Sequence, residues 1–249
     1  MIKFFRNIRQ RMLIENKVSR YLLYALGEIA LVMIGILLAL QVNNWNELEK
    51  EKKEEQKLLT DLRSEFSQNE VSLDSVLKKT KDAHSSLSVL LRLIGADSLH
   101  DFRGKKLDSL LIECLDNPYW DRTEFILRDL ENSGRLSKLT NKKLKLALYK
   151  WSQLNSSISD KDEDANIAYR YFLNYLKVHG SLRQIDIFQD LKEKRSNLTI
   201  DHSFLLTDLK FENAIDDFLI YTQQRVERLE KAKIIIEQII KASDSSTAN

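Results

Sequence analysis

Glycine and proline are scarce in this sequence. Its 249 residues include 6 Gly and 1 Pro, and both counts are well below the usual share in globular proteins. Both residues are unfavourable inside a helix, because glycine is too flexible there and proline lacks the amide donor. A chain with so few of them can form long helices with few interruptions. We therefore expect an all-α fold.

Sequence signals of enzymatic chemistry are also absent. The chain has no glycine-rich phosphate loop and no nucleophile elbow. Cys114 is the only cysteine, so no disulfide can form within the chain. The four histidines are scattered, with no pair at helical spacing: His84, His100, His179 and His202. Because a metal site needs ligands that converge, we expect no metal, no cofactor, no catalytic residue and no enzymatic activity.

An acidic run on the C-terminal side has the spacing of the first three ligands of a calcium-binding loop, at Asp160, Asp162 and Asp164. That loop needs a glycine and a bidentate glutamate further on. The sequence has Ala165 and Tyr171 at those positions. A solvated acidic turn or helix face is the better interpretation.

Basic residues are in excess only at the N-terminal end. The net charge is +2, but residues 1–42 alone carry six Lys or Arg against two Glu. The remainder of the chain is therefore slightly acidic, and no basic surface is expected there. This argues against a nucleic-acid partner.

One long hydrophobic run is present, at residues 21–42, with Glu28 as its only charge. About 20 apolar residues in a helix cross a bilayer core of about 30 Å. A buried core helix is the alternative, but a basic stretch precedes this run, and amides and Trp45 follow it. Tryptophan beside amides is typical of the headgroup region. We predict a transmembrane helix with Trp45 as its interfacial anchor, so that the lipid bilayer is one partner.

The flanks of this helix predict its direction. Six Lys or Arg precede it, whereas four Lys mixed with five Glu follow it within fifteen residues. The positive-inside rule then places the N-terminus in the cytoplasm and the C-terminal part outside. No small-x-small cleavage site follows the apolar run, so we expect an uncleaved signal anchor. Apolar residues on one face of residues 1–20 also fit an interfacial amphipathic helix.

A candidate interface lies on this membrane helix at Glu28, Gly35 and Ala39, which share one helical face. Gly35 and Ala39 form a small-x-x-x-small pattern that lets helices approach closely, and Glu28 offers a polar contact. A protonated Glu28 that faces lipid, beside small residues placed by chance, is an equally good interpretation.

The stretch YLLYALGEIALVMIGILLALQVNNWNE resembles the opening of the domain of unknown function 6090 family, a group of uncharacterised bacterial membrane proteins. The resemblance extends through ENSGRLSKLTNKKLKLALYKW and towards the C-terminal helix. It implies a protein of the bacterial inner membrane, with the C-terminal part in the periplasm. It implies no activity and no catalytic residue.

The remainder of the chain shows helical spacing of its apolar residues. A 3-4 alternation runs from Leu59 to Ile94, with Asn69 and Thr80 in two of its positions, which predicts a coiled-coil-like seam or one face of a bundle. Two more long helices are predicted over residues 144–175 and 215–240, with short helices at 105–116 and 123–132. We expect Asn141 or Thr140 to cap the second long helix.

The predicted organisation has four parts. They are a basic cytoplasmic segment (1–20), the transmembrane helix (21–42), a periplasmic antiparallel bundle with a coiled-coil-like stalk (43–242) and a disordered tail (243–249). Aromatic residues of the second long helix are candidate pocket or core residues: Trp151, Tyr171, Phe172 and Tyr175. At helical spacing such residues are more often core.

Two functions remain open at this point. The first is a non-enzymatic, membrane-anchored module that binds another membrane or periplasmic protein, or itself as a homo-oligomer. The second is a periplasmic sensor or ligand-binding module, in which the aromatic residues contact a small molecule and a separate membrane protein carries the signal.

We predict that residues 47–249, produced without the anchor, are soluble and predominantly α-helical, because three long segments show helical spacing with almost no Pro or Gly. Circular dichroism measures this directly. A spectrum dominated by strand or coil would contradict the predicted fold class.

Overall fold

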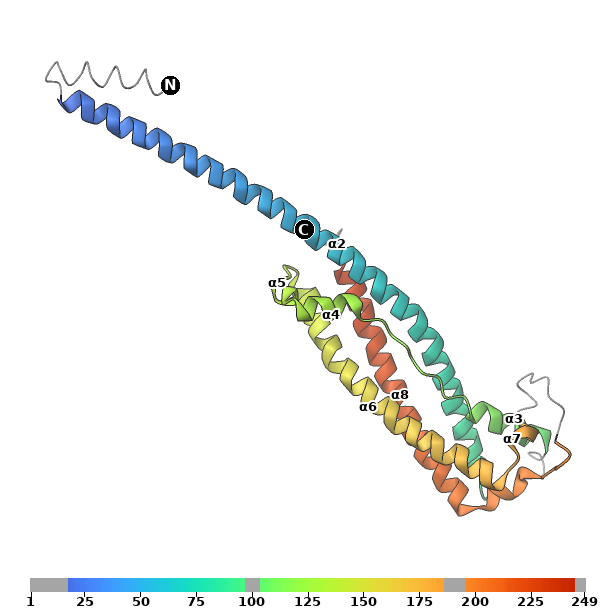
Figure 1. Cartoon of the computed structure of the whole chain (residues 1–249). Coiled ribbons are helices and arrows are strands. Elements are labelled where there is room, and N and C mark those ends of the chain that lie inside the picture. The colour runs from blue at the N-terminus through green and yellow to red at the C-terminus, as the bar shows by residue number, and fades with distance from the viewer. Residues whose placement is uncertain (1–17, 97–103, 186–195, 245–249) are drawn as a thin grey trace. The chain divides into compact units, whose positions relative to one another are not determined.

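The computed structural model describes residues 18–96, 104–185 and 196–244, and every regular element in these ranges is a helix (Figure 1). The predicted all-α class is confirmed. The α-helices are α2 (Val18–Leu93), α3 (Lys105–Cys114), α4 (Phe125–Asn132), α5 (Arg135–Lys138), α6 (Lys142–His179), α7 (Leu182–Ile185) and α8 (Leu209–Ala242), and η3 (His202–Thr207) is a 3₁₀-helix.

The chain divides into two units, one that ends at Lys57 and one that begins at Leu58. Helix α2 contributes to both, since it is continuous from Val18 to Leu93. In the first unit α2 is the only described element. The predicted amphipathic segment at 1–20 lies almost entirely outside the described residues, as does most of the predicted tail.

The second unit is held together by two hydrophobic clusters along three long helices. Cluster 1 comprises Leu59, Leu62, Phe66, Leu73 and Leu77 of α2, Leu144, Ala147, Leu148, Trp151 and Ile158 of α6, and Val226, Leu229, Ala232, Ile236 and Ile239 of α8, with Trp120, Leu127, Leu130, Leu136 and Leu139 from the segments between α3 and α6. Cluster 2 comprises Leu87 and Leu90 of α2, Ala168, Phe172, Tyr175 and Leu176 of α6, and Phe211, Ile215 and Phe218 of α8, with Leu107, Leu110, Leu111, Ile112, Cys114, Ile185, Leu205 and Leu206 from shorter elements.

The order of the clusters gives the direction of each helix. Cluster 1 residues precede cluster 2 residues along α2 and α6, but follow them along α8. Helix α8 is therefore antiparallel to the other two, as the ion pairs Lys81–Glu230 and Asp74–Lys233 also indicate. The predicted antiparallel packing is confirmed for α8, whereas α2 and α6 run in the same direction.

A parallel pair of helices requires a connection that returns along the bundle. Helix α3 packs in cluster 2 and α4 packs in cluster 1. The chain between them, residues 115–124, is non-helical and leads from one to the other (Figure 1). Pro118 lies in this returning segment and is compatible with it, because proline cannot continue a helix.

Polar side chains of α2 hold the returning segment in place. Asn69 is 2% exposed. Its Nδ2 donates to the carbonyl of Thr123 at 2.8 Å, and its Oδ1 accepts from the amide of Thr123 at 2.9 Å. One turn before, Glu65 accepts from the amide of Ile126 at 3.0 Å, and one turn after, Ser72 accepts from the indole of Trp120 at 2.9 Å. These bonds tie the returning segment and the start of α4 to the polar side chains of α2.

Side-chain caps fix the beginnings of the two later long helices. Asn141 accepts hydrogen bonds from the amides of Lys143 and Leu144, so the predicted cap of α6 is Asn141. The same side chain donates to the carbonyl of Ala242 at 2.9 Å and so joins the start of α6 to the end of α8. Asp208 caps α8 through the amide of Lys210.

We expect Asn69→Ala to lower the free energy of unfolding by about 1–3 kcal/mol, because the buried Asn69 side chain makes two hydrogen bonds to the backbone of Thr123 and the substitution removes both. Denaturation of the full chain in detergent, followed by the fluorescence of Trp120 and Trp151 in cluster 1, measures the change. Gln68→Ala is the control, since Gln68 is the exposed neighbour on the same helix. Equal effects of the two substitutions would contradict the role assigned to Asn69.

Candidate functional site

The most unusual surface in the described chain is the apolar part of α2. Leu22–Val42 contains one charge, and its large hydrophobic side chains are all more than half exposed, from 54% for Leu40 to 76% for Leu23. It lies in the one helix of the described residues that is long and apolar enough to cross a membrane. A core helix of a soluble protein meets the same criteria of length and composition, but its side chains are mostly buried, and these are exposed.

The three residues of the predicted interface lie on this exposed surface. Glu28, Gly35 and Ala39 are all exposed. Their spacing of seven and four residues keeps them on one face of the helix. A Cβ atom added at Gly35 would meet nothing within 4 Å. The face is thus open for close approach of another helix.

The end of the apolar segment is polar and helical. Trp45 is 66% exposed, and Asn43 donates to Glu47 one turn later at 3.1 Å. Exposed ion pairs follow along the same helix, Lys52–Glu49 at 3.8 Å and Lys50–Glu54 at 4.0 Å. Such pairs contribute little to stability, but they keep this part of α2 compatible with water.

The four candidate aromatic residues of α6 do not gather in one place. Trp151 is fully buried in cluster 1, where its ring meets those of Phe66 and Trp120 edge-on, with centroids 5.5 and 5.9 Å away. Phe172 and Tyr175 belong to cluster 2. Tyr171 is 55% exposed.

Sequence reasoning missed a buried ion pair between α6 and α8. Arg225 Nε lies 3.0 Å from Asp162 Oδ1, and both side chains are less than a tenth exposed. Arg225 also donates to Asn117 Oδ1 at 2.6 Å, and Asn117 Nδ2 donates to Asn166 Oδ1 at 2.8 Å. Asp162 Oδ2 is buried and makes no hydrogen bond.

Burial dominates the electrostatics of this pair. Burial raises the pKa of Asp162, and the positive charges of Arg225 and Arg122 oppose it only in part. Burial likewise lowers the pKa of Arg225 against the effect of Asp162. The two charges therefore attract each other but do not recover the full cost of leaving water. The 160–164 acidic run was the one signal in the sequence, and it lies within α6, where the expectation of a solvated face is wrong for the buried Asp162.

A second buried polar group joins α3 to the chain around η3. His202 Nδ1 lies 2.6 Å from Asp108 Oδ1, and both side chains are buried. The other ring nitrogen accepts from the amide of Ser181 at 3.0 Å, which assigns the imidazole proton to Nδ1, facing Asp108. Gln184 donates to Asp108 Oδ2 at 3.0 Å. Both ring nitrogens are paired and the ring is buried, so this pair holds the backbone at Ser181 against α3.

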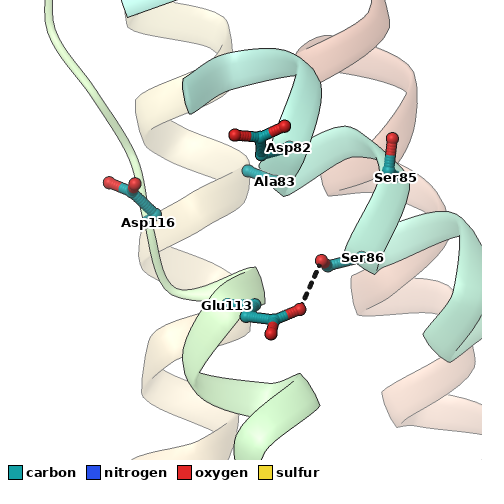
Figure 2. A pocket seen from close by; sticks show the side chains of 6 residues that line it. All are labelled: Asp82, Ala83, Ser85, Ser86, Glu113 and Asp116. Carbon is teal, nitrogen blue, oxygen red and sulfur yellow. Dashed lines mark hydrogen bonds between the residues drawn. The ribbon is translucent and has the colours of Figure 1, made fainter. Parts of the chain in front are cut away.

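An open hollow of about 480 Å³ lies beside α2 and α3, and Figure 2 shows the side chains that line it. Its lining consists of Asp82, Ala83, Ser85, Ser86, Glu113 and Asp116. Ser86 donates to Glu113 at 2.9 Å across the hollow. The lining contains no aromatic side chain and no cation. Within the described ranges, which do not include His100, no three His, Cys, Asp or Glu side chains converge as metal ligands would.

Comparison with protein families matches residues 28–151 to a family of unknown function (DUF6090). This confirms the resemblance seen in the sequence, from Glu28 of the apolar run to Trp151 of cluster 1. The expected extension towards the C-terminal helix is outside the matched residues. Comparisons with curated proteins and with solved structures found no match.

One buried group gives a pH-dependent prediction. The hydroxyl of Tyr175 donates to Asp208. Burial first, and then this bond, raises the pKa of Tyr175 from 10.0 to about 12. The folded chain thus holds the phenol proton more firmly than the unfolded chain. The resulting stabilisation is fully present below pH 10.0 and is lost as the pH rises through about 12.

We therefore expect the free energy of unfolding to fall across this alkaline range, and to fall less in Tyr175→Phe. At neutral pH the substitution should cost about 1 kcal/mol for the lost hydrogen bond. Urea denaturation at a series of pH values measures both effects. Tyr149→Phe, at an exposed position of α6, controls for the substitution at neutral pH. An unchanged alkaline slope in Tyr175→Phe would refute the assignment.

Proposed function

We propose that this chain, which belongs over residues 28–151 to the DUF6090 family of unknown function, is a membrane-anchored helical interaction module. Residues 21–42 cross the inner membrane of a bacterium once, residues 1–20 lie in the cytoplasm, and the bundle lies in the periplasm. The module has no enzymatic activity of its own and binds another protein or a second copy of itself.

One observation carries the proposal, the exposure of the apolar surface of Leu22–Val42. An exposed helix of 21 residues with Glu28 as its only charge is poorly suited to water, but it suits a bilayer, where its backbone groups are satisfied within the helix. Trp45 and the neighbouring amides then fall at the level of the lipid headgroups. The ion-paired part of α2 that follows supplies a short stalk between membrane and bundle.

The proposal includes a coiled-coil-like stalk, and the position of the predicted apolar seam limits which residues can form it. Many of the seam positions beyond Leu58 are buried against α6 and α8, for example Leu62, Leu73 and Leu87. They therefore serve as one face of the bundle in the single chain. A stalk that pairs with a second copy would use residues 47–57, most of which are exposed.

The arrangement of aromatic residues favours an interaction module over a ligand-binding sensor. A sensor would use aromatic side chains that converge on an accessible pocket. Trp151 and Phe172 are instead fully buried in separate clusters, and the described hollow is lined by carboxylates and hydroxyls.

The orientation is testable with reporter fusions after Asn249. The surplus of basic residues before the membrane helix predicts a cytoplasmic N-terminus. A reporter that is active only in the periplasm should be active, and one that is active only in the cytoplasm should be silent. The opposite pattern would contradict the proposed orientation, but it would not contradict the proposal that residues 21–42 cross the membrane.

The membrane helix interface gives a second test. Gly35→Leu should reduce association of the full chain, because a large side chain prevents close approach. Glu28→Leu should have a smaller effect, since polar contacts between membrane helices contribute only about 1 kcal/mol. Both variants should still insert, because both make the segment more apolar.

Ala30→Leu is the matched control, because Ala30 is a small residue on the opposite face of the same helix. Crosslinking in native membranes measures association. If Gly35→Leu and Ala30→Leu behave alike, this face is lipid-facing surface and the bundle carries the specificity.

A further inference from the structure

The two hydrophobic clusters of the bundle are separated by a layer without large apolar side chains. On α2, the buried residues between Leu77 of cluster 1 and Leu87 of cluster 2 are Thr80 and Ala83. On α6, between Ile158 and Ala168, they are Asp162 and Ala165. On α8, between Phe218 and Val226, they are Thr222 and Arg225. These six residues form the polar layer.

Within the polar layer, Arg225 makes the polar contacts between helices. Arg225 reaches Asp162 on α6 through its side chain and through the backbone carbonyl of Asp162, 3.2 Å from Nη2. It also reaches Asn117 in the returning segment. The hydroxyls of Thr80 and Thr222 bond to carbonyls of their own helices, at Val76 and Phe218.

A buried ion pair in such a layer is not explained by stability. Replacing a buried pair with apolar residues is often neutral or stabilising, whereas breaking it by removing one partner is costly. The better-attested use of such groups is to fix register or to create a switch. Asp162 and Arg225 meet in one register of α6 and α8, because a shift by one turn would leave both charges buried without a partner.

The helix ends are distributed unequally on the two sides of the layer. Helix α2 ends at Leu93, α6 ends at His179 and α8 begins at Leu209, all in the cluster 2 half. In the cluster 1 half α6 begins and α8 ends, but α2 passes through without interruption. Helix ends open more easily than helix interiors.

We propose that the polar layer is a conformational break built into the bundle. It fixes the register of α6 and α8 in the closed state, and it lets the cluster 2 half open while the cluster 1 half stays folded. The chain then has a movable half and a half that is continuous with the apolar part of α2. This inference does not depend on the proposed interaction with a partner.

Hydrogen exchange of the full chain in detergent micelles at increasing urea tests the proposal. The amides of 87–93, 168–179 and 209–218 should have protection factors about tenfold lower than those of 59–77, 144–158 and 226–239, as expected for separate opening units. They should also lose protection at lower urea. Equal protection and equal urea dependence in the two halves would overturn the proposal.

Variants of the polar layer test whether the layer causes the lower protection of the cluster 2 half. Asp162→Leu with Arg225→Met should bring the two sets of protection factors together, because an apolar layer joins the clusters into one core. Thr80→Val with Thr222→Val keeps the shape of the layer and should reduce the difference in protection factors between the two halves in part. This variant provides the test if the first variant does not fold. The exposed pair Asp74–Lys233 provides the control, and Asp74→Asn with Lys233→Gln should leave the difference unchanged. If neither layer variant reduces the difference in protection factors between the two halves, the polar layer does not cause the separate opening.

Discussion

An apolar helix surface that water cannot solvate is the constraint on which the rest of this structure depends. Leu22–Val42 satisfies its backbone within the helix but leaves its large hydrophobic side chains exposed. Exposed apolar surface of this extent marks a site of contact with membrane or protein. The charged residues that follow make the same helix soluble before it enters the bundle. A single element, α2, thus links an apolar surface to a water-compatible domain.

Within the bundle, polar side chains decide the arrangement that apolar packing leaves open. Leucine-rich helix faces would pack in several registers, since apolar contacts are not directional. Asn69 fixes the returning segment through both backbone groups of Thr123. The Asp162–Arg225 pair fixes one register of α6 against α8. These contacts are directional and therefore favour the observed arrangement, in which α2 and α6 run parallel and α8 runs antiparallel to both.

The sequence predicted the helices well and their contacts poorly. Periodicity and the shortage of Gly and Pro identified the long helices, because those signals are local. The parallel course of α2 and α6 could not be read from periodicity, since it depends on where α3 and α4 pack. Asn69 was visible as a polar residue in an apolar seam, but its partner lies 54 residues away. Asp162 was interpreted as part of a solvated acidic turn or helix face, but it is buried, and its partner Arg225 lies on another helix.

The central claim is that the apolar part of α2 lies inside a bilayer. Labelling of single introduced cysteines in native membranes with a water-soluble maleimide tests it directly, and the buried Cys114 gives little background. Met33→Cys lies within the apolar segment and Lys53→Cys lies in the charged part of the same helix, and both positions are exposed. If the apolar part of α2 lies inside a bilayer, only Lys53→Cys should be labelled in intact membranes, and Met33→Cys should become reactive after detergent is added. Equal labelling of both cysteines in intact membranes would contradict it.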